Sequence, residues 1–181
     1  MQTLPDYLHL GLDIVFVGIN PGLFSAKVGH YFAMPRNRFW TALNRSGLVS
    51  IGRDLGPDDD ALMPSLGIGF TDVVKRPSAM ASNLAVADYR SWAPVCREKL
   101  LRYASRVICF NGLVGYNNFR LFTDGVREKA VLGVQPGRIG DSRVFVAPSP
   151  SPANAAYSLD DLAEWYRRLA EFRDAVKRGD A

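Results

Sequence analysis

Short apolar runs separated by stretches with helical spacing constrain the fold of this chain more than any other feature. Each run is a few residues long and is bounded by turn-forming residues, as expected of buried strands; the runs lie at 14–17, 69–74, 106–110, 131–134 and 144–147. Between them, apolar residues such as Leu113, Tyr116 and Phe119 recur at helical intervals. Strands that alternate with helices predict an α/β fold with a mostly parallel central sheet of about five strands and helices on both faces.

The last helix has the clearest start signal. Ser158 and Asp161 approximate a capping box, with Asp in place of the usual Glu or Gln. Apolar residues then follow at helical intervals: Leu159, Leu162, Trp165, Tyr166, Leu169 and Phe172. We expect this helix to cover one face of the sheet.

The composition suits a single domain over residues 1–181, since 48% of the residues are hydrophobic and the composition does not shift along the chain. The first residues do not resemble a secretory signal, and no run reaches transmembrane length. Cys96 and Cys109 have no spacing typical of a disulfide framework or of a zinc or iron-sulfur site. We therefore expect a cytoplasmic monomer.

The net charge of +4 comes from 22 basic and 18 acidic residues. Most of the basic residues are arginines, whose planar guanidinium suits phosphate oxygens, so a nucleic-acid partner is compatible with the composition. A solvated basic surface without such a partner explains the charge equally well.

Polar side chains follow the carboxyl ends of four predicted strands, which lie at one edge of a parallel sheet. They are Asn20 in the turn that runs from Gly18 to Gly22, Asp72, the pair Asn111 and Gly112 before a helix, and Ser149 and Ser151 in the proline-serine loop at 148–152. Gly22 would let a ligand approach the backbone closely, and the helix start after Asn111 would attract an anion such as phosphate.

Each of these residues also has a purely structural interpretation. Asn20 could form the turn, Asp72 could cap a turn or helix, Asn111 could cap the following helix, and the serines could satisfy loop backbone groups. The coincidence of four polar strand ends favours a ligand site only modestly over these alternatives.

The stretch at 27–40 mixes bases with aromatic residues outside any periodic pattern, which suits base stacking flanked by phosphate contacts. Lys27 is a candidate phosphate contact, and either Tyr31 or Phe32 is a candidate stacking face. His30 is a candidate acid or base without an identified partner. The three acids at 58–60 are predicted to form the acidic first turn of a helix rather than a metal site.

The motifs together resemble the mismatch-specific uracil-DNA glycosylase and thymine-DNA glycosylase family, within the uracil-DNA glycosylase superfamily. The most specific part is the run Gly-Ile-Asn-Pro-Gly-Leu at 18–23, followed at family spacing by Gly29, Phe32 and Asn-Arg-Phe-Trp at 37–40. Further matches are the Gly-Phe-Thr-Asp run at 69–72 with Arg76 and Pro77, Phe-Asn-Gly at 110–112, Gln135 with Pro136, and the Pro-Ser run at 148–151. The resemblance covers residues 12 to 172.

The resemblance implies a three-layer αβα fold that flips uracil out of DNA, including from G:U mismatches, and hydrolyses its N-glycosidic bond in base excision repair without a metal or cofactor. By position, the backbone at Gly18 and Ile19 would bond the polar edge of the base, Phe32 would stack on it, and Asn20 would place the attacking water. Because an amide is not a strong base, the implied mechanism is dissociative, with an anionic leaving base and a sugar cation. Ser25 and Ser151 would also face the base.

Asp72 departs from the family pattern, since better-known members carry lysine or asparagine there. A carboxylate could activate water or stabilise the sugar cation, so we expect Asp72 to supplement or partly replace Asn20 in catalysis. The expected DNA contacts are Lys27, Asn111, Gly112, Ser149, Pro152, Ala153 and Asn154.

The loop at 152–154 departs as well. Family members place a bulky wedge there, which fills the space left by the flipped base, whereas Pro152, Ala153 and Asn154 are small. We therefore expect a weaker preference for the opposite base and activity on single strands. Leu113 stands where a relative carries a lysine that contacts phosphate.

Two rival functions remain open from the sequence. One is a module of the same fold that binds damaged or abasic DNA without cutting it. The other is a hydrolase of free nucleosides or nucleotides, which the arginine-rich surface argues against only weakly.

Overall fold

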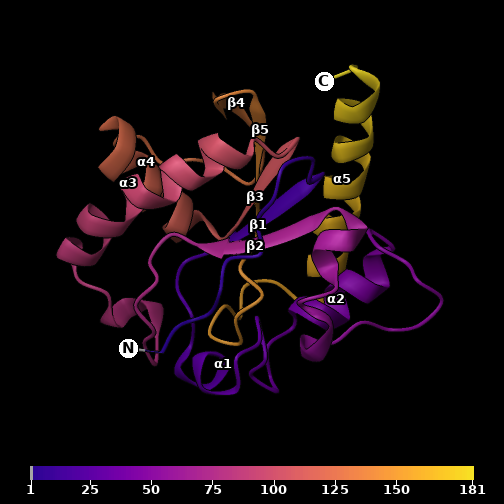
Figure 1. Cartoon of the computed structure of the whole chain (residues 1–181), viewed down its shortest axis with the longest axis horizontal. Coiled ribbons are helices and arrows are strands. Elements are labelled where there is room, and N and C mark those ends of the chain that lie inside the picture. The colour runs from indigo at the N-terminus through magenta and orange to yellow at the C-terminus, as the bar shows by residue number, and fades with distance from the viewer. Residues whose placement is uncertain (1) are drawn as a thin grey trace.

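The computed structural model describes residues 2–181, which form a five-stranded sheet between two sets of helices (Figure 1). The strands are β1 (Ile14–Gly18), β2 (Ile68–Asp72), β3 (Val107–Asn111), β4 (Gly133–Ile139) and β5 (Ser142–Ala147). Their order across the sheet is β2-β1-β3-β5-β4, and only the β4–β5 pair is antiparallel. The predicted α/β fold with a mostly parallel sheet of five strands is confirmed.

The helices cover both faces of the sheet. They are α1 (Leu23–Val28), α2 (Phe39–Ser46), α3 (Val86–Tyr103), α4 (Leu113–Asp124) and α5 (Leu159–Arg178), with short 3-10 turns η1 (Pro57–Asp59), η2 (Met63–Leu66) and η3 (Ala81–Asn83). Figure 1 shows α3 and α4 on one side of the sheet and α2 and α5 on the other. The chain therefore has the three-layer αβα arrangement.

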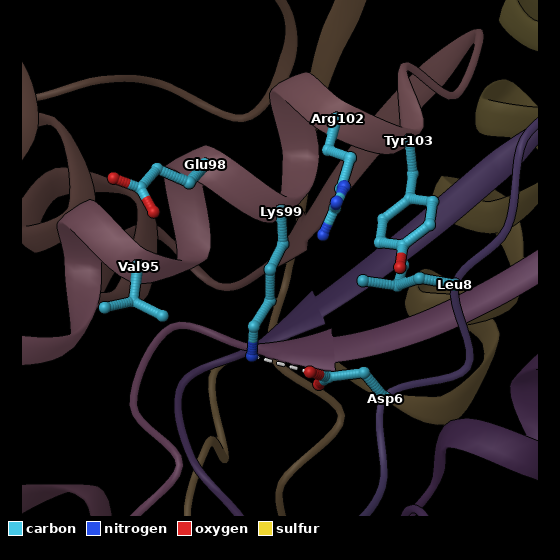
Figure 2. A pocket seen from close by; sticks show the side chains of 7 residues that line it. All are labelled: Asp6, Leu8, Val95, Glu98, Lys99, Arg102 and Tyr103. Carbon is cyan, nitrogen blue, oxygen red and sulfur yellow. Dashed lines mark hydrogen bonds and ion pairs between the residues drawn. The ribbon is translucent and has the colours of Figure 1, made fainter.

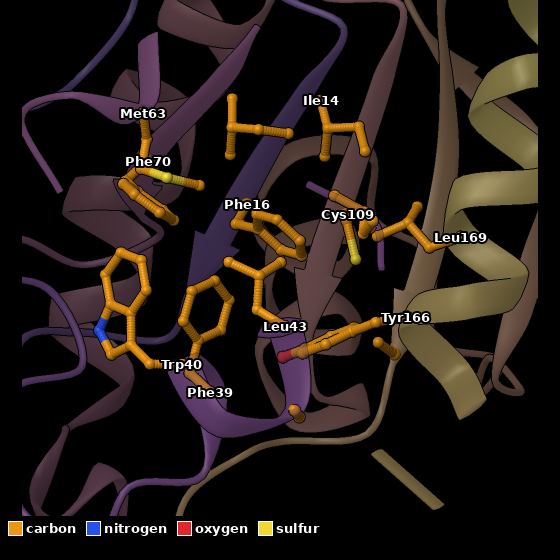
Figure 3. Packing of buried hydrophobic residues seen from close by; sticks show 14 of the residues in the cluster. Ile14, Phe16, Phe39, Trp40, Leu43, Met63, Phe70, Cys109, Tyr166 and Leu169 are labelled. Carbon is orange, nitrogen blue, oxygen red and sulfur yellow. The ribbon is translucent and has the colours of Figure 1, made fainter. Parts of the chain in front are cut away.

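Alternation along the strands divides the core into two clusters. In β1, Phe16 packs among the residues of α2 and α5, whereas Val15 and Val17 pack toward α3 and α4. The first cluster is rich in aromatic side chains (Figure 3), and Phe16 meets Phe39 edge-on with ring centroids 5.1 Å apart. Burial on both faces explains why the strands read as continuous apolar runs.

The capping box of α5 is confirmed by its hydrogen bonds. The Ser158 hydroxyl accepts a hydrogen bond from the Asp161 N–H at 3.1 Å, and the Asp161 carboxylate accepts one from the Ser158 N–H at 2.8 Å. Two backbone donors at the start of the helix are thereby satisfied.

The fourth strand differs from its prediction. It begins at Gly133 rather than at residue 131, runs to Ile139 and includes Pro136. Its pairing with β5 is irregular between Val134 and Arg138. A proline cannot donate to a sheet ladder, and this edge strand tolerates Pro136 because the ladder is interrupted there.

Cys96 and Cys109 are both buried free thiols. Burial raises the pKa of Cys96 to about 12 and raises the pKa of Cys109 further above its ordinary value. Across residues 2–181, no helix combines the length and apolar character needed to span a membrane.

Candidate active site

The turn after β1 is tied to the segment that follows β2. The Asn20 Nδ2 donates hydrogen bonds to the Arg76 carbonyl at 2.9 Å and to the Ser78 hydroxyl at 2.8 Å. A carbonyl can only accept, so this contact fixes the amide with its nitrogen toward 76–78. Asn20 thus stabilises the turn, as its structural interpretation required, and its Oδ1 remains on the opposite side as an acceptor.

Asp72 ends β2 and lies across from Gly18 in the register of β1 and β2. A Cβ at position 18 would lie 2.5 Å from the Asp72 Oδ1, so glycine is needed there for the carboxylate to lie against β1. The Asp72 side chain therefore points into the fold, and the alternative of a turn or helix cap is wrong.

The Asp72 carboxylate is buried and incompletely paired. Within residues 2–181, its Oδ2 has no hydrogen-bond partner, and the Lys75 ammonium lies 3.5 Å away. Burial raises the pKa of Asp72 to about 6, while Lys75 acts in the opposite direction. At neutral pH the site therefore holds a poorly solvated carboxylate.

Asn111, at the end of β3, is a second buried polar group with an unused atom. Its Oδ1 accepts a hydrogen bond from the Tyr166 hydroxyl at 3.2 Å, whereas its Nδ2 has no partner in the described part of the chain. The alternative that Asn111 caps α4 is wrong, because Gly112 occupies the cap position. An orphaned buried donor of this kind is rare unless a ligand or water completes it.

Close backbone approaches bring the strand ends together. Gly112 has φ +115°, and a Cβ there would lie 3.2 Å from the Ser149 Cβ. A Cβ at Gly115 on α4 would lie 3.0 Å from the Ile19 Cγ1 in the first turn. The turn at Asn20, the start of α4 and the proline-serine loop therefore lie in contact.

The proline-serine loop is held by its own side chains. The Ser149 hydroxyl accepts from the Ser151 N–H, and the Ser151 hydroxyl accepts from the Ala153 N–H, both at 3.3 Å. The Asn154 Nδ2 donates to the Ser149 carbonyl at 3.0 Å. The polar side chains of this loop are thus largely engaged within it.

Arg38 organises the same loop from the start of α2, and the sequence reasoning missed this role. Its guanidinium donates to the carbonyls of Ser151 at 2.9 Å and Asn154 at 2.7 Å, and also to the Tyr157 carbonyl. Its N–H donates to the Pro150 carbonyl at 3.2 Å. Only the matching run at 37–40 pointed to this residue, and nothing in that run indicates a partner 112 or more residues away.

Phe32 rather than Tyr31 is the aromatic residue with an accessible face. Tyr31 is 2% exposed, and its hydroxyl donates to the Pro5 carbonyl at 2.9 Å. Phe32 is half-buried, stacks on Phe39 with centroids 4.0 Å apart, and has φ +53°. A positive φ is strained for a bulky residue and is typical of functional sites.

Two further predicted residues occupy different environments. Ser25 is 6% exposed, and its hydroxyl accepts a hydrogen bond from the Ala33 N–H at 3.1 Å, so it anchors the segment that carries Phe32. Lys27 is exposed in the last turn of α1. Ser25 supports the site from beneath, and Lys27 lies on the surface.

The acidic run at 58–60 was predicted only in part. Asp58 and Asp59 belong to the 3-10 turn η1, but Asp60 is fully buried. The Asp60 carboxylate accepts from the Tyr31 N–H at 2.8 Å and lies 3.1 Å from the His30 Nδ1. Sequence alone gave the three acids one role because the cap pattern does not reveal which side chain turns inward. No cluster of metal-ligating side chains occurs between residues 2 and 181.

Fold and site together define an αβα protein whose polar site lies at the carboxyl ends of a parallel sheet, where such folds bind ligands. Residues 5–173 match the family model described as the uracil DNA glycosylase superfamily, and the chain belongs to this superfamily.

One curated relative agrees with this assignment, and one solved structure shares the fold. A protein from Schizosaccharomyces pombe, named G/U mismatch-specific uracil DNA glycosylase, is 33% identical over 174 residues; the match covers 94% of this chain and 54% of that protein. The chain therefore spans about half the length of this relative. A solution NMR structure from Methanosarcina acetivorans, provisionally assigned as a uracil DNA glycosylase, shares the fold with a TM-score of 0.59 and 22% identity, covering 94% of this chain and 98% of the other.

Proposed function

We propose that this protein is a monofunctional DNA glycosylase that flips uracil out of DNA, with G:U mismatches among its substrates, and leaves an abasic site. The observation that carries the proposal is a pair of buried polar groups, Asp72 and Asn111, each with one atom that has no hydrogen-bond partner within residues 2–181, at the carboxyl ends of β2 and β3, the two strands that flank β1. Membership of the superfamily and the name of the fission yeast relative support the substrate.

The free amide of Asn111 supports recognition of uracil. The Tyr166 hydroxyl holds the Asn111 Oδ1, so the Nδ2 is the atom left to contact a ligand. A donor at this point suits the O4 carbonyl of uracil and opposes the N4 amino group of cytosine. Phe32 would stack on the flipped base with its free face. Lys27 and the N–H groups near Gly112 would contact the DNA backbone.

The first turn would contribute backbone donors and a water position. The carbonyls of Gly18 and Ile19 already accept from the Val73 and Val74 N–H groups at 2.9 Å. Any backbone contact from this turn to a base would therefore come from N–H groups, which suit a base that leaves as an anion. The Asn20 Oδ1, on the far side of its fixed amide, would hold the attacking water.

Asp72 would supply the negative charge of the site. As the glycosidic bond breaks, the sugar gains oxocarbenium character, and a poorly solvated carboxylate stabilises a cation more strongly than a solvated one. The same carboxylate could accept a proton from the water that attacks. Asp72 and Asn20 would then act as a pair, with Asp72 as the charged member.

The small residues at 152–154 support a weak preference for the base opposite uracil. Ala153 has no side chain long enough to fill the space left by a flipped base, and the Asn154 Nδ2 is engaged with the Ser149 carbonyl. We accordingly propose activity on single-stranded as well as duplex DNA.

The test is alkaline cleavage of uracil-containing oligonucleotides, presented as G:U duplex, A:U duplex and single strand. Asp72→Ala and Asn20→Ala should each lower single-turnover excision by about 100-fold or more, since a positioned acid-base or charged group contributes roughly 10²–10⁴-fold. Asp141→Ala, at an exposed carboxylate, is the matched control and should excise like the wild type.

Full activity of Asp72→Ala would eliminate its catalytic role. Tight binding without alkali-labile sites would point instead to a non-catalytic module for damaged DNA. Hydrolysis of free nucleosides without action on DNA would favour the nucleoside hydrolase. A strict requirement for opposite guanine would contradict the reasoning from residues 152–154.

A further inference from the structure

Four charged side chains of alternating sign form a chain that runs from the candidate active site to the surface. The Asp72 Oδ2 lies 3.5 Å from the Lys75 Nζ, which lies 2.9 Å from the Asp6 Oδ1. The Asp6 Oδ2 in turn lies 2.6 Å from the Lys99 Nζ on α3. The sequence reasoning assigned no role to Asp6, Lys75 or Lys99.

The outer end of this chain lies in a groove of about 500 Å³ between α3 and the N-terminal segment. Figure 2 shows Lys99 extending from α3 to Asp6, with Leu8 and Tyr103 beside the pair. The inner end is buried, since the Lys75 side chain is only 7% exposed. The chain of charges therefore connects a solvent-facing groove with a closed interior.

Lys75 is shared between two carboxylates and lies closer to Asp6. Its ammonium donates to the Asp6 Oδ1 at 2.9 Å and to the Tyr31 hydroxyl at 3.2 Å. The Asp6 Oδ1 also accepts from the Thr71 hydroxyl at 2.7 Å, which fixes its position. Asp6 thus holds the ammonium and at the same time competes with Asp72 for it.

We propose that Lys75 is a positioning residue that keeps the Asp72 carboxylate ionised for catalysis, and that Asp6 limits this effect by competing for the same ammonium. The inference rests on the proposed catalytic role of Asp72. It assigns to Lys75 and Asp6 the control of the pH range in which the enzyme works.

Few groups between residues 2 and 181 face Asp72. Gly18 on β1 adds no charge, and Tyr31 lies on the segment after α1. Lys75 lowers the pKa of Asp72 against the effect of burial, whereas Asp6 raises it. On α3, the charge of Asp72 also raises the pKa of the Cys96 thiol, but burial already keeps this thiol protonated. Removal of Lys75 and removal of Asp6 should therefore shift the pKa of Asp72 in opposite directions.

The experiment is an NMR titration of the Asp72 carboxyl carbon in the full chain, with the Asp72→Asn spectrum giving the assignment. In Lys75→Met, whose side chain has a similar length, the titration midpoint should rise from about 6 to above about 7, because burial is then unopposed. In Asp6→Asn, the released ammonium should lower the midpoint below about 5. Lys75→Arg should restore a midpoint near that of the wild type.

The matched control is Lys177→Met, which removes a half-exposed ammonium paired with Asp13 at 2.8 Å. Its Asp72 midpoint should equal that of the wild type. In the pH profile of single-turnover uracil excision, the midpoint of the acidic limb should shift together with the NMR midpoint in every variant. A merely structural role of Lys75 would lower excision at all pH values and leave the midpoint in place.

An unchanged midpoint in both Lys75→Met and Asp6→Asn would overturn the inference. If Lys75→Met does not fold, Asp6→Asn alone decides, because its expected shift has the opposite sign. Midpoints that shift as expected while the excision profile stays fixed would uphold the control of Asp72 by Lys75 and overturn the catalytic role of Asp72. The two failures are thus distinguishable.

Discussion

Asp60 and Asp72 are both buried carboxylates, but they differ in how many hydrogen-bond partners surround them. Asp60 is fully buried and has three partners, the Tyr31 N–H at 2.8 Å, His30 at 3.1 Å and the Tyr7 hydroxyl at 3.3 Å. Asp72 is 4% exposed, and its Oδ2 has no hydrogen bond within residues 2–181.

The difference separates a structural carboxylate from one that is available for chemistry. A buried carboxylate with enough donors holds its surroundings together, because each donor would otherwise lose its partner. One with too few donors weakens the fold and keeps its charge available to a ligand. Three predictions test this comparison.

The largest expected effect comes from Asp60→Ala. The change leaves the Tyr31 N–H and His30 without their acceptor, so the free energy of unfolding should fall by about 3 to 5 kcal/mol. Urea denaturation at neutral pH measures it. Asp58→Ala, at a carboxylate whose side chain is 98% exposed, is the matched control and should change stability by less than about 0.5 kcal/mol. A loss below about 1 kcal/mol in Asp60→Ala would contradict the structural role of Asp60 and its contrast with Asp72.

The second expected effect is a gain in stability, on substitution of Asp72. The pKa of Asp72 is raised to about 6, above its value of about 4 in the unfolded chain, so the folded protein binds the proton more tightly. The stability that this residue contributes is present below about pH 4 and is lost as the pH rises to about 6. Asp72→Asn should therefore stabilise the protein by about 1 to 3 kcal/mol at pH 7.5 and by almost nothing at pH 4.

Urea denaturation at the two pH values checks this. Equal stability of Asp72→Asn and wild type at pH 7.5 would mean that the ionised carboxylate is better satisfied than its contacts indicate. A gain in stability together with a loss of excision would instead show the usual trade-off at an active site.

The smallest effect is expected from His30→Gln. Glutamine can still donate to Asp60, and His30 is one of three partners, so the loss of stability should stay below about 1 kcal/mol. The acidic limb of excision should keep its midpoint, because it reports Asp72. A loss of excision of more than about tenfold in a stably folded His30→Gln would show that His30 takes part in the reaction, so the Asp60 site would no longer be purely structural.

The sequence predicted the parts of the site that depend on local pattern. Strand periodicity placed Asn20, Asp72, Asn111 and Ser149 at strand ends, and the sheet order brings those ends to one edge. It could not predict Lys75 and Asp6 as partners, because their contact depends on how the N-terminal segment packs beside β2.

Other features also required the three-dimensional structure. The bond from Tyr166 to Asn111 joins residues 55 positions apart, and no helical or strand repeat encodes it. The antiparallel direction of β4 was missed because a short apolar run does not show its direction. Asp60 received the same role as Asp58, since adjacent acids look alike until packing turns one inward.

The contacts of Arg38 imply how the proline-serine loop moves. One guanidinium donates to the carbonyls of Ser151, Asn154 and Tyr157, so these carbonyls cannot be released one at a time without leaving the charged group partly unpaired. The loop should open as one cooperative unit rather than fray from its ends. The conformational entropy of the loop is then lost during folding rather than during the encounter with DNA. A rigid surface of this kind can bind without a preceding rearrangement.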